Sequence, residues 1–380
     1  MPRTADIQTE NGNANATVAG VFKQIMATDA VDAMLVPYRP AGNRMIMPTL
    51  ITDAELLAHA EPLAPAFAVN AARLVSRLTR RPSGRRMAAV LRPCEIRAFI
   101  ELVKLNQGQT EDLVIIGIDC PGAFQNTDFF EAMDTHGEKI TAWFLQSALP
   151  QGGEVAEVSG LAPACRTCTQ PTPDGADIAV GLFGMDIGKN CQLYSQTETG
   201  DAVFDQMGMK AADTTPQRQT AVDALESRRS EARQQMIDET RAATDSLEKM
   251  AEYFSRCINC YNCRVACPVC YCRECVFTTD VFDHGPEQYM KWGQRKGSVK
   301  MPTDTLFYHL TRLAHMSTAC VNCGQCSNAC PNDIPVMELF ATVSAQTQAA
   351  FDYVPGQSVE ESPPLAVFKE EEFEEVVGVK

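Results

Sequence analysis

The stretches CINCYNCRVACP, residues 257–268, and CVNCGQCSNACP, residues 320–331, share one spacing of four cysteines, C-x2-C-x2-C-x3-C, followed by proline. Thiolates at this spacing hold 4Fe-4S clusters, and where the motif occurs twice the last cysteine of each copy ligates the other cluster. A chance origin is improbable when two complete copies each end in Cys-Pro. The sequence therefore predicts a two-cluster domain that transfers electrons one at a time.

This crossed ligation divides the eight cysteines into two sets of four. We call them the first set, Cys257, Cys260, Cys263 and Cys330, and the second set, Cys320, Cys323, Cys326 and Cys267. Three further cysteines crowd behind Pro268, namely Cys270, Cys272 and Cys275. We expect these three to pack around a cluster and tune its potential, and a further metal site or alternative ligation is left open. Cys191 stands alone and is expected in the core.

Composition narrows the class of protein. A chain of 380 residues exceeds the usual size of one core, so two or three domains are expected. The amino-terminal residues MPRTADIQTE lack the apolar segment of a secretory signal, and reduced thiols are typical of the cytosol. No apolar run reaches the roughly 20 residues that cross a bilayer. The net charge of −15 argues against nucleic-acid binding. We expect a cytoplasmic protein without direct membrane insertion.

Residues 1–212 are expected to form an α/β core domain, a mixed sheet with helices. Apolar runs predict strands at 31–36, 87–91, 113–118 and 176–183, and helical spacing predicts helices at 17–26, 66–78 and 96–103. Strands that alternate with helices indicate a sheet that is at least partly parallel.

The rest of the chain is divided into three predicted parts. Residues 213–256 are a helical linker, with an apolar stripe from Val222 to Phe254 and charges such as Glu226 and Arg229 between the apolar positions. Residues 257–345 are a ferredoxin-like two-cluster domain. Residues 346–380 are an acidic tail, which contains the glutamate-rich segment 370–375.

A third set of cysteines is scattered through the core. We call Cys94, Cys120, Cys165 and Cys168 the core set. The first two follow apolar strands and the last two form a C-x2-C pair, so the four could converge on one metal site, since α/β sheets bind cofactors at their carboxyl ends. Separate buried thiols are the alternative, because a free cysteine behaves as a small hydrophobe.

A few lone polar residues are also candidates. Glu95 after Cys94 and Asp119 before Cys120 would either polarise a cofactor or cap helices. His309 and His315 precede the second motif, and we expect roles at the surface or beside a cluster rather than ligation.

Four stretches carry a resemblance to a known family. They are AVLRPCEIRAFIELVKLNQGQTEDLVIIGIDCPG (89–122), ACRTCTQPTPDGADIAVGLFG (164–184), CINCYNCRVACPVCYCREC (257–275) and CVNCGQCSNACPNDIPVMELF (320–340). They resemble the beta subunits of coenzyme factor 420-reducing hydrogenases and formate dehydrogenases, most closely the formate dehydrogenase branch. The resemblance covers roughly residues 15–356.

The resemblance implies a third 4Fe-4S cluster on the core set, and FAD, with a deazaflavin coenzyme as partner in methanogens. A flavin would split the electron pair of a hydride donor for one-electron clusters. The family's Gly-Gly turn near the flavin corresponds here to Asn15-Ala16. We expect a flavin site between residues 11–17 and the sheet ends near Cys94 and Cys120, with Asn15, Ala16 and Thr17 as the candidate residues.

Two functions follow from these expectations. In the first, the chain is the iron–sulfur subunit of a soluble complex in which a molybdenum or tungsten subunit oxidises formate. It passes electrons to a flavin and two-electron carrier, or to a heterodisulfide reductase-type partner. In the alternative, it is a flavin-free wiring module without its own substrate site, which links a hydrogenase or dehydrogenase to another reductase complex.

Overall fold

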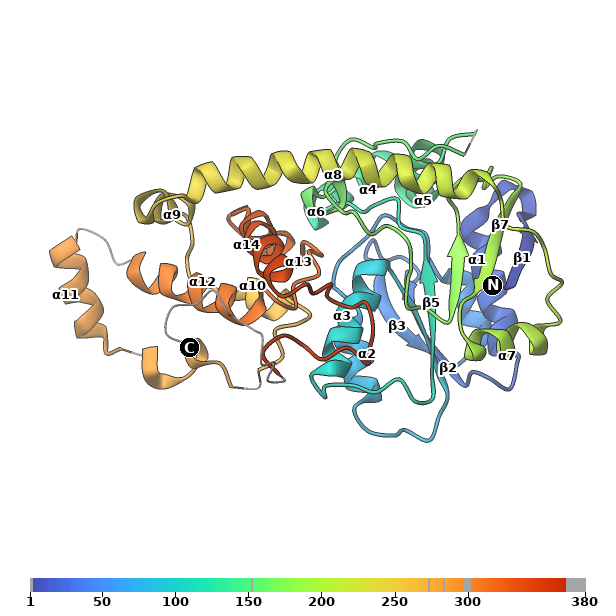
Figure 1. The fold of residues 1–380 in the computed structure, drawn as a ribbon, viewed down its shortest axis with the longest axis horizontal. Coiled ribbons are helices and arrows are strands. Elements are labelled where there is room, and N and C mark those ends of the chain that lie inside the picture. The colour runs from blue at the N-terminus through green and yellow to red at the C-terminus, as the bar shows by residue number, and fades with distance from the viewer. Residues whose placement is uncertain (1–2, 152, 273, 283, 297–301, 367–380) are drawn as a thin grey trace.

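The computed structural model describes residues 3–151, 153–272, 274–282, 284–296 and 302–366. Figure 1 shows an α/β core on the right, an iron–sulfur lobe on the left, and the long helix α8 (Gln217–Thr244) running along both. The glutamate run predicted at 370–375 lies outside the described residues. No helix in the described ranges is both long and apolar enough to cross a bilayer.

The core is built on a sheet whose strand order is β1-β7-β6-β5-β4-β2-β3. The strands are β1 (Arg3–Gln8), β2 (Ala33–Tyr38), β3 (Met47–Ile51), β4 (Met87–Leu91), β5 (Leu113–Ile118), β6 (Ile178–Gly181) and β7 (Asn190–Ser195). The strands β2, β4, β5 and β6 are parallel neighbours, whereas the β2–β3, β6–β7 and β7–β1 pairs are antiparallel. This confirms the predicted mixed sheet. Leu91 pairs with Gly117, so the carboxyl ends of β4 and β5 lie side by side.

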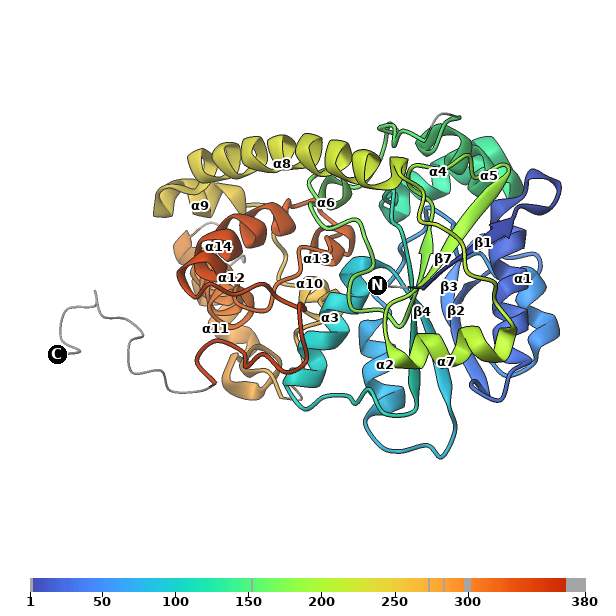
Figure 2. The same cartoon turned by 45° about the vertical axis from the view of Figure 1, so that its right-hand side comes forward.

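Helices cover both faces of this sheet, as Figure 2 shows. The core helices are α1 (Ala14–Met26), α2 (Ala72–Thr79), α3 (Pro93–Lys104), α4 (Asn126–His136), α5 (Ile140–Ala148), α6 (Pro163–Arg166) and α7 (Glu198–Met207), with 3-10 turns at Glu10–Gly12, Ala54–His59 and Gly137–Lys139. Successive side chains of β4 point to opposite faces of the sheet, so they belong to different apolar clusters. Val90 belongs to the core cluster that contains α1, α4, α5 and α7 residues, and Leu91 to the cluster that contains α2 and α3 residues.

Some local expectations differ from the structure. The helix predicted at 66–78 begins only at Ala72, because Asn70 accepts a hydrogen bond from the Ala72 N–H at 3.0 Å and prolines stand at 62 and 65. The single helix predicted through the linker is two helices. The chain turns at Asp245, and the Ser246 side chain caps α9 (Leu247–Tyr253) by accepting from the Lys249 N–H at 3.2 Å.

The iron–sulfur lobe packs on the α2–α3 face of the sheet. Its helices are α10 (Asn262–Ala266), α11 (Pro286–Lys296), α12 (Pro302–Met316), α13 (Gln325–Asn328) and α14 (Val336–Ala350), with 3-10 turns at Val276–Thr278 and Asp280–Phe282. Phe254, Tyr308 and Phe340 share one apolar cluster with Phe99 of α3. The Gln325 side chain donates to the Phe67 carbonyl at 2.8 Å, across the junction. The predicted domain boundary at residue 345 falls inside α14; the other boundaries stay predictions.

Candidate iron-sulfur centres

The four cysteines of the core set line one cavity at the carboxyl edge of the sheet. Cys94 lies in the first turn of α3, which follows β4, and Cys120 follows β5. Cys165 lies on α6 and Cys168 in the loop after it, so these two do not follow a strand directly, whereas we expected all four cysteines of the core set at strand ends. This loop reaches the sheet because the Cys120 N–H donates to the Pro171 carbonyl at 2.9 Å. The convergence that was left open is therefore present.

Hydrogen-bond donors surround these thiols. The Arg92 guanidinium donates to the sulfur of Cys120 at 3.6 Å and to the Ala64 carbonyl at 2.6 Å. The Ala123 N–H donates to the sulfur of Cys165 at 3.3 Å. Burial, together with the neighbouring thiols Cys120 and Cys168, raises the pKa of Cys165 to about 12. Four thiols that line one cavity, next to donors that stabilise sulfur charge, are a donor set suited to a 4Fe-4S cluster.

The two carboxylates beside these cysteines have structural partners. Glu95 accepts from the Arg92 N–H at 2.8 Å and from the Ala71 N–H at 2.7 Å, so it ties the starts of α3 and α2 together. Asp119 is buried and pairs with Arg218 at the start of α8. It also accepts from the Leu182 N–H at 2.8 Å. Of the two roles that the sequence left open for these carboxylates, Glu95 has the capping one, and Asp119 holds the loop that presents Cys120.

The four cysteines of the first set line a second cavity, in the iron–sulfur lobe. Cys330 of the other motif is among them. The Tyr308 hydroxyl lies 3.3 Å from the sulfur of Cys263, and His309 Nε2 lies 3.6 Å from the sulfur of Cys257. His309 is buried and stacks on Phe254 with ring centroids 3.8 Å apart, so it packs beside a candidate ligand rather than at the surface.

The second set is brought together around Cys267. After burial, the Cys267 thiol is the largest influence that raises the pKa of both Cys320 and Cys323. Arg312 lies between the two sets, buried, with its guanidinium donating to the Cys263 carbonyl at 3.2 Å. Burial lowers the pKa of Arg312, but the thiols Cys263 and Cys267, one from each set, raise it, and the net direction is upward. Crossed ligation requires Cys267 to lie beside the cysteines of the other motif, and it lies beside Cys320 and Cys323.

The second set and the core set are neighbours. Cys323 lines the core cavity beside Cys94, and its thiol is, after burial, the largest influence that raises the pKa of Cys94. The approach depends on Gly324, where φ is +78° and an added Cβ would lie 2.5 Å from the Ala164 side chain on α6. The chain thus places the three cysteine sets in a row.

The remaining cysteines differ in exposure. Cys270 is buried, Cys275 is half-buried and Cys272 is exposed. Cys191 on β7 is fully buried, as expected of a core residue. Among the residues that the structure describes, no group of three or more His, Cys, Asp or Glu is arranged to hold a single metal ion.

The loop predicted to contact a flavin is engaged within the chain. The Asn15 amide donates to the Ala60 carbonyl at 3.2 Å, and its oxygen accepts from the Leu63 N–H at 3.1 Å. The Ala16 N–H donates to the Asn13 side chain, and the Thr17 hydroxyl accepts from the Glu10 N–H. These residues build the start of α1, and their polar groups do not fit a flavin as they stand.

Sequence reasoning missed the arginines at these sites. Arg229 was counted among the charges between the apolar positions of the linker, yet it is 2% exposed and donates to the Pro121 carbonyl at 2.6 Å. Arg233 follows one turn later on α8 and lines a cavity together with Cys168 and Asn322. The signal was present, because residues 229 and 233 continue the three- and four-residue steps of Val222 and Leu225.

Comparisons with known proteins agree with this arrangement. Residues 84–220 match the family described as the C terminus of the coenzyme F420 hydrogenase/dehydrogenase beta subunit, and residues 253–334 match "4Fe-4S dicluster domain". The chain is 26% identical to the F420-dependent formate dehydrogenase subunit beta of Methanocaldococcus jannaschii, over 94% of this chain and 97% of the relative. It is 27% identical to the F420-dependent formate dehydrogenase 1 subunit beta of Methanococcus maripaludis, over 94% of each chain.

One solved structure is also similar. It is described as "Xenon derivatization of the F420-reducing [NiFe] hydrogenase complex from Methanosarcina barkeri", with 13% identity, a TM-score of 0.45, and coverage of 65% of this chain and 94% of that chain. That likeness is too low to support a conclusion. The sequence relatives and the two domain matches instead confirm the resemblance, and the chain is an iron–sulfur electron-transfer subunit related to the beta subunits of the coenzyme F420 hydrogenase and dehydrogenase family.

Proposed function

We propose that this chain carries electrons between a catalytic dehydrogenase subunit that oxidises formate and a second redox partner, in the cytoplasm. The names of its relatives supply the formate dehydrogenase part of this proposal. The observation that carries it is the position of Cys323, which belongs to the second set and also lines the core cavity. Three adjacent cysteine sets, each able to hold a 4Fe-4S cluster, are suited to electron transport.

The residues of each set would hold one 4Fe-4S cluster, and such clusters accept and release single electrons when bound. Crossed ligation by Cys267 and Cys330 would keep the first and second sites at a fixed separation. Arg312 between them, and Arg92 beside Cys120, supply positive charge and hydrogen bonds that favour the reduced state of the neighbouring site.

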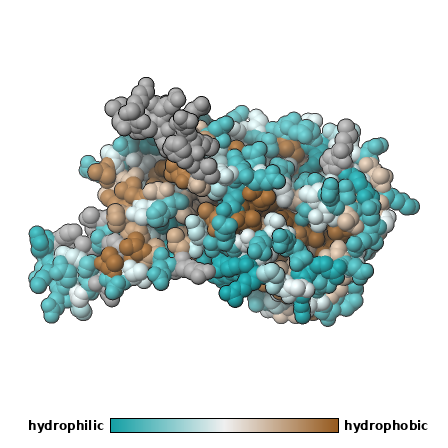
Figure 3. All heavy atoms as spheres, turned by 60° about the horizontal axis from the view of Figure 1, so that its bottom comes forward, coloured by the Kyte–Doolittle hydropathy of each residue, from teal (hydrophilic) through white to brown (hydrophobic). Residues whose placement is uncertain are grey.

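The first set lies at one end of the three cysteine sets, and a partner can reach it there. Cys260 is exposed, and the neighbouring side chains Ile258 and Val265 are 63% and 60% exposed. Figure 3 shows apolar side chains gathered over the lobe that contains α11 and α12. Exposed apolar surface beside a redox site is typical of a docking face, so we infer that the catalytic subunit binds here.

The partner at the core end is a two-electron carrier reached through a flavin, or a reductase of the heterodisulfide type. The contacts of Asn15 favour the flavin-free alternative, because both ends of its amide already bind the chain. No electron step is therefore assigned to a flavin. Cofactor analysis after anaerobic purification distinguishes electron transfer through a flavin from the flavin-free alternative. Bound FAD would support the function in which a flavin passes electrons to a two-electron carrier.

The test is formate-dependent reduction. The chain is purified anaerobically with the catalytic subunit that accompanies it, and about 12 irons per chain are expected, four for each cluster. Formate should then bleach the iron–sulfur absorbance of the complex. An Ile258→Glu, Val265→Glu variant should keep its iron but lose binding and bleaching. Full iron content without formate-dependent bleaching in the parent complex would contradict the proposal.

A further inference from the structure

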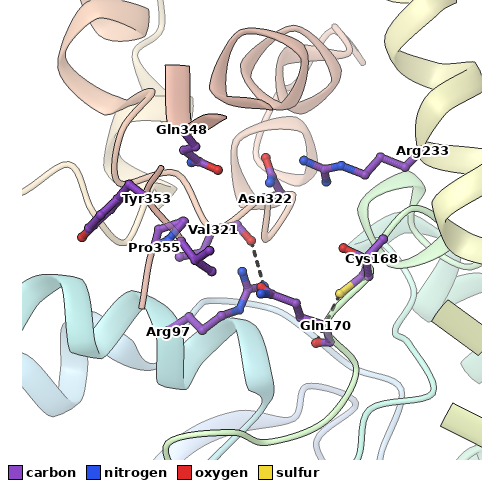
Figure 4. A pocket seen from close by; sticks show the side chains of 11 residues that line it. Arg97, Cys168, Gln170, Arg233, Val321, Asn322, Gln348, Tyr353 and Pro355 are labelled. Carbon is purple, nitrogen blue, oxygen red and sulfur yellow. Dashed lines mark hydrogen bonds between the residues drawn. The ribbon is translucent and has the colours of Figure 1, made fainter. Parts of the chain in front are cut away.

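A polar cavity lies between the α/β core and the iron–sulfur lobe, beside two of the three cysteine sets (Figure 4). Arg97 of α3 and Arg233 of α8 line it from opposite sides. Figure 4 shows Arg233 extending toward Asn322, while Arg97 extends below it, next to Gln170. Helices α3 and α8 and the loops that contain Gln170 and Asn322, four separate parts of the fold, thus supply its polar wall.

No carboxylate lines the cavity that the two guanidinium groups face, and outside the lining the Asp174 carboxyl interacts with Arg97. Arg97 donates to the Val321 carbonyl at 3.1 Å, and its buried Nε has no partner. Among the residues that the structure describes, neither Arg97 nor Arg233 takes part in an ion pair of the kind that joins Arg218 to Asp119. Burial lowers the pKa of Arg233, because removal from water disfavours its charged form. Keeping a positive charge at this site therefore costs free energy. The charges that act on Arg233 are the thiols Cys168 and Cys320 and the guanidinium of Arg97.

The remaining wall includes residues 353–355, which follow α14 and are held against α3 by hydrogen bonds and close packing. The Tyr353 hydroxyl donates to Glu101 of α3 at 2.6 Å, and the Gly356 N–H donates to the same carboxylate at 2.8 Å. Lys104 completes this buried group, 3.1 Å from Glu101. An added Cβ at Gly356 would lie 2.4 Å from the Arg97 backbone, so this segment packs directly on the helix that presents the arginine.

We propose that the cavity binds a small oxyanion, the carboxylate or phosphate group of a small molecule, between Arg97 and Arg233. Guanidinium groups bind both kinds of oxyanion through paired hydrogen bonds and are the preferred residues for them in partly buried sites. The amides of Gln170 and Asn322 add polar contacts, and Tyr353 supplies an apolar side for the rest of the molecule. A few polar groups that converge in a preformed pocket are typical of a ligand site.

The location makes binding depend on redox state, a consequence that rests on the proposed function. Gln170 follows Cys168 of the core set, and Asn322 follows Cys320 of the second set, so the anion would lie beside both sites. An added electron brings negative charge next to it. Reduction should therefore weaken anion binding, and by linkage the anion should lower both reduction potentials by the same coupling.

A different reading is that the two arginines only offset thiolate charge. It predicts that replacing Arg233 changes the potentials without any dependence on added anion. Anion binding itself therefore separates the two readings.

The experiment uses the oxidised, iron-loaded full chain in a chloride-containing zwitterionic buffer, titrated by calorimetry with inorganic phosphate in one arm and formate in the other. We expect saturable binding of one or both probes with one site per chain. Arg233→Gln and Arg97→Gln should each weaken it about tenfold or more, the value of one charge-assisted contact. Arg241→Gln, on the exposed face of the same helix, makes the same charge change and should leave binding intact.

Iron content, measured first, confirms that each variant is folded, and Arg233→Lys provides a variant that keeps the charge. Absence of saturable binding by the parent, or equal losses in the Arg241 variant and the Arg233 variant, would overturn the proposal. A parent that binds neither probe but transfers electrons normally would leave the proposed function standing. Potentiometry with and without phosphate gives the second readout, and potentials that do not respond to a bound anion would overturn the linkage.

Discussion

Replacing Asp119 with alanine should be severely destabilising and should release the core cluster first. The Asp119 side chain is 0% exposed, while that of its partner Arg218 is 16% exposed. It accepts from Arg218 Nη2 at 2.8 Å and from the N–H groups of Leu182 and Phe183 at 2.8 and 3.2 Å. The variant leaves a largely buried guanidinium and two N–H groups without their acceptor.

The magnitude follows from these contacts. Removing one partner of a buried pair costs about 3–5 kcal/mol. The orphaned N–H groups add to this, but the slight exposure of Arg218 allows water to offset part of the loss. We expect about 3–4 kcal/mol in the free energy of unfolding. At about 2–4 °C per kcal/mol for a domain of this size, the midpoint of thermal unfolding should fall by about 6–16 °C.

The assay is anaerobic thermal unfolding followed by far-ultraviolet circular dichroism, with iron analysis of the same samples. Because Asp119 precedes Cys120 directly, we expect the iron content to fall by about one third, the share of one cluster in three. Asp201→Ala is the control, since its side chain is 47% exposed and lies 3.9 Å from Arg3; it should change stability by less than about 0.5 kcal/mol. A midpoint for the Asp119 variant within about 2 °C of the parent would show that these contacts do not stabilise the core as described.

Three further predictions concern the cysteines and their neighbours. Cys267→Ser should abolish the electron paramagnetic resonance signal of the second site while the first site keeps its own; loss of the first signal alone would contradict crossed ligation. Arg312→Met should lower the potentials of both sites in the lobe by on the order of 50–100 mV, because it removes a buried positive charge between them; potentiometry that finds no shift would exclude this role. Cys191 should resist alkylation in the folded protein at neutral pH, since burial raises its pKa to about 12; mass spectrometry that finds it modified would show that β7 opens.

The parts of the fold that the sequence predicted well are those with local signals. The ranges of β4 and β5 match the prediction because both strands are buried on both faces and so read as continuous apolar runs. The strands β1, β3 and β7 were not predicted. β1 and β7 carry polar residues, and they are strands because they pair with each other. Arg3 pairs with Ser195, so the partners are separated in sequence by most of the core domain. Such long-range pairing leaves little trace in a local pattern.

The candidate sites divide in the same way. The repeated spacing in the lobe identified the first and second sets directly, because motif cysteines are close in sequence. The core set is scattered over residues 94–168, and its convergence depends on the register that places the end of β4 beside β5. The buried arginines at residues 229 and 312 and the half-buried ones at 92, 97 and 233 were missed, because a charged side chain is expected at the surface unless its partner is known.

The presence of three adjacent clusters on one chain is tested most directly by electron paramagnetic resonance of the fully reduced, anaerobically purified protein. We predict about three spins per chain, with signals broadened by magnetic interaction. That broadening should diminish in a Cys165→Ser variant, which removes the core site next to Cys323. Two spins in the parent, or three spins whose signals are sharp and unchanged by the variant, would contradict the three-cluster arrangement.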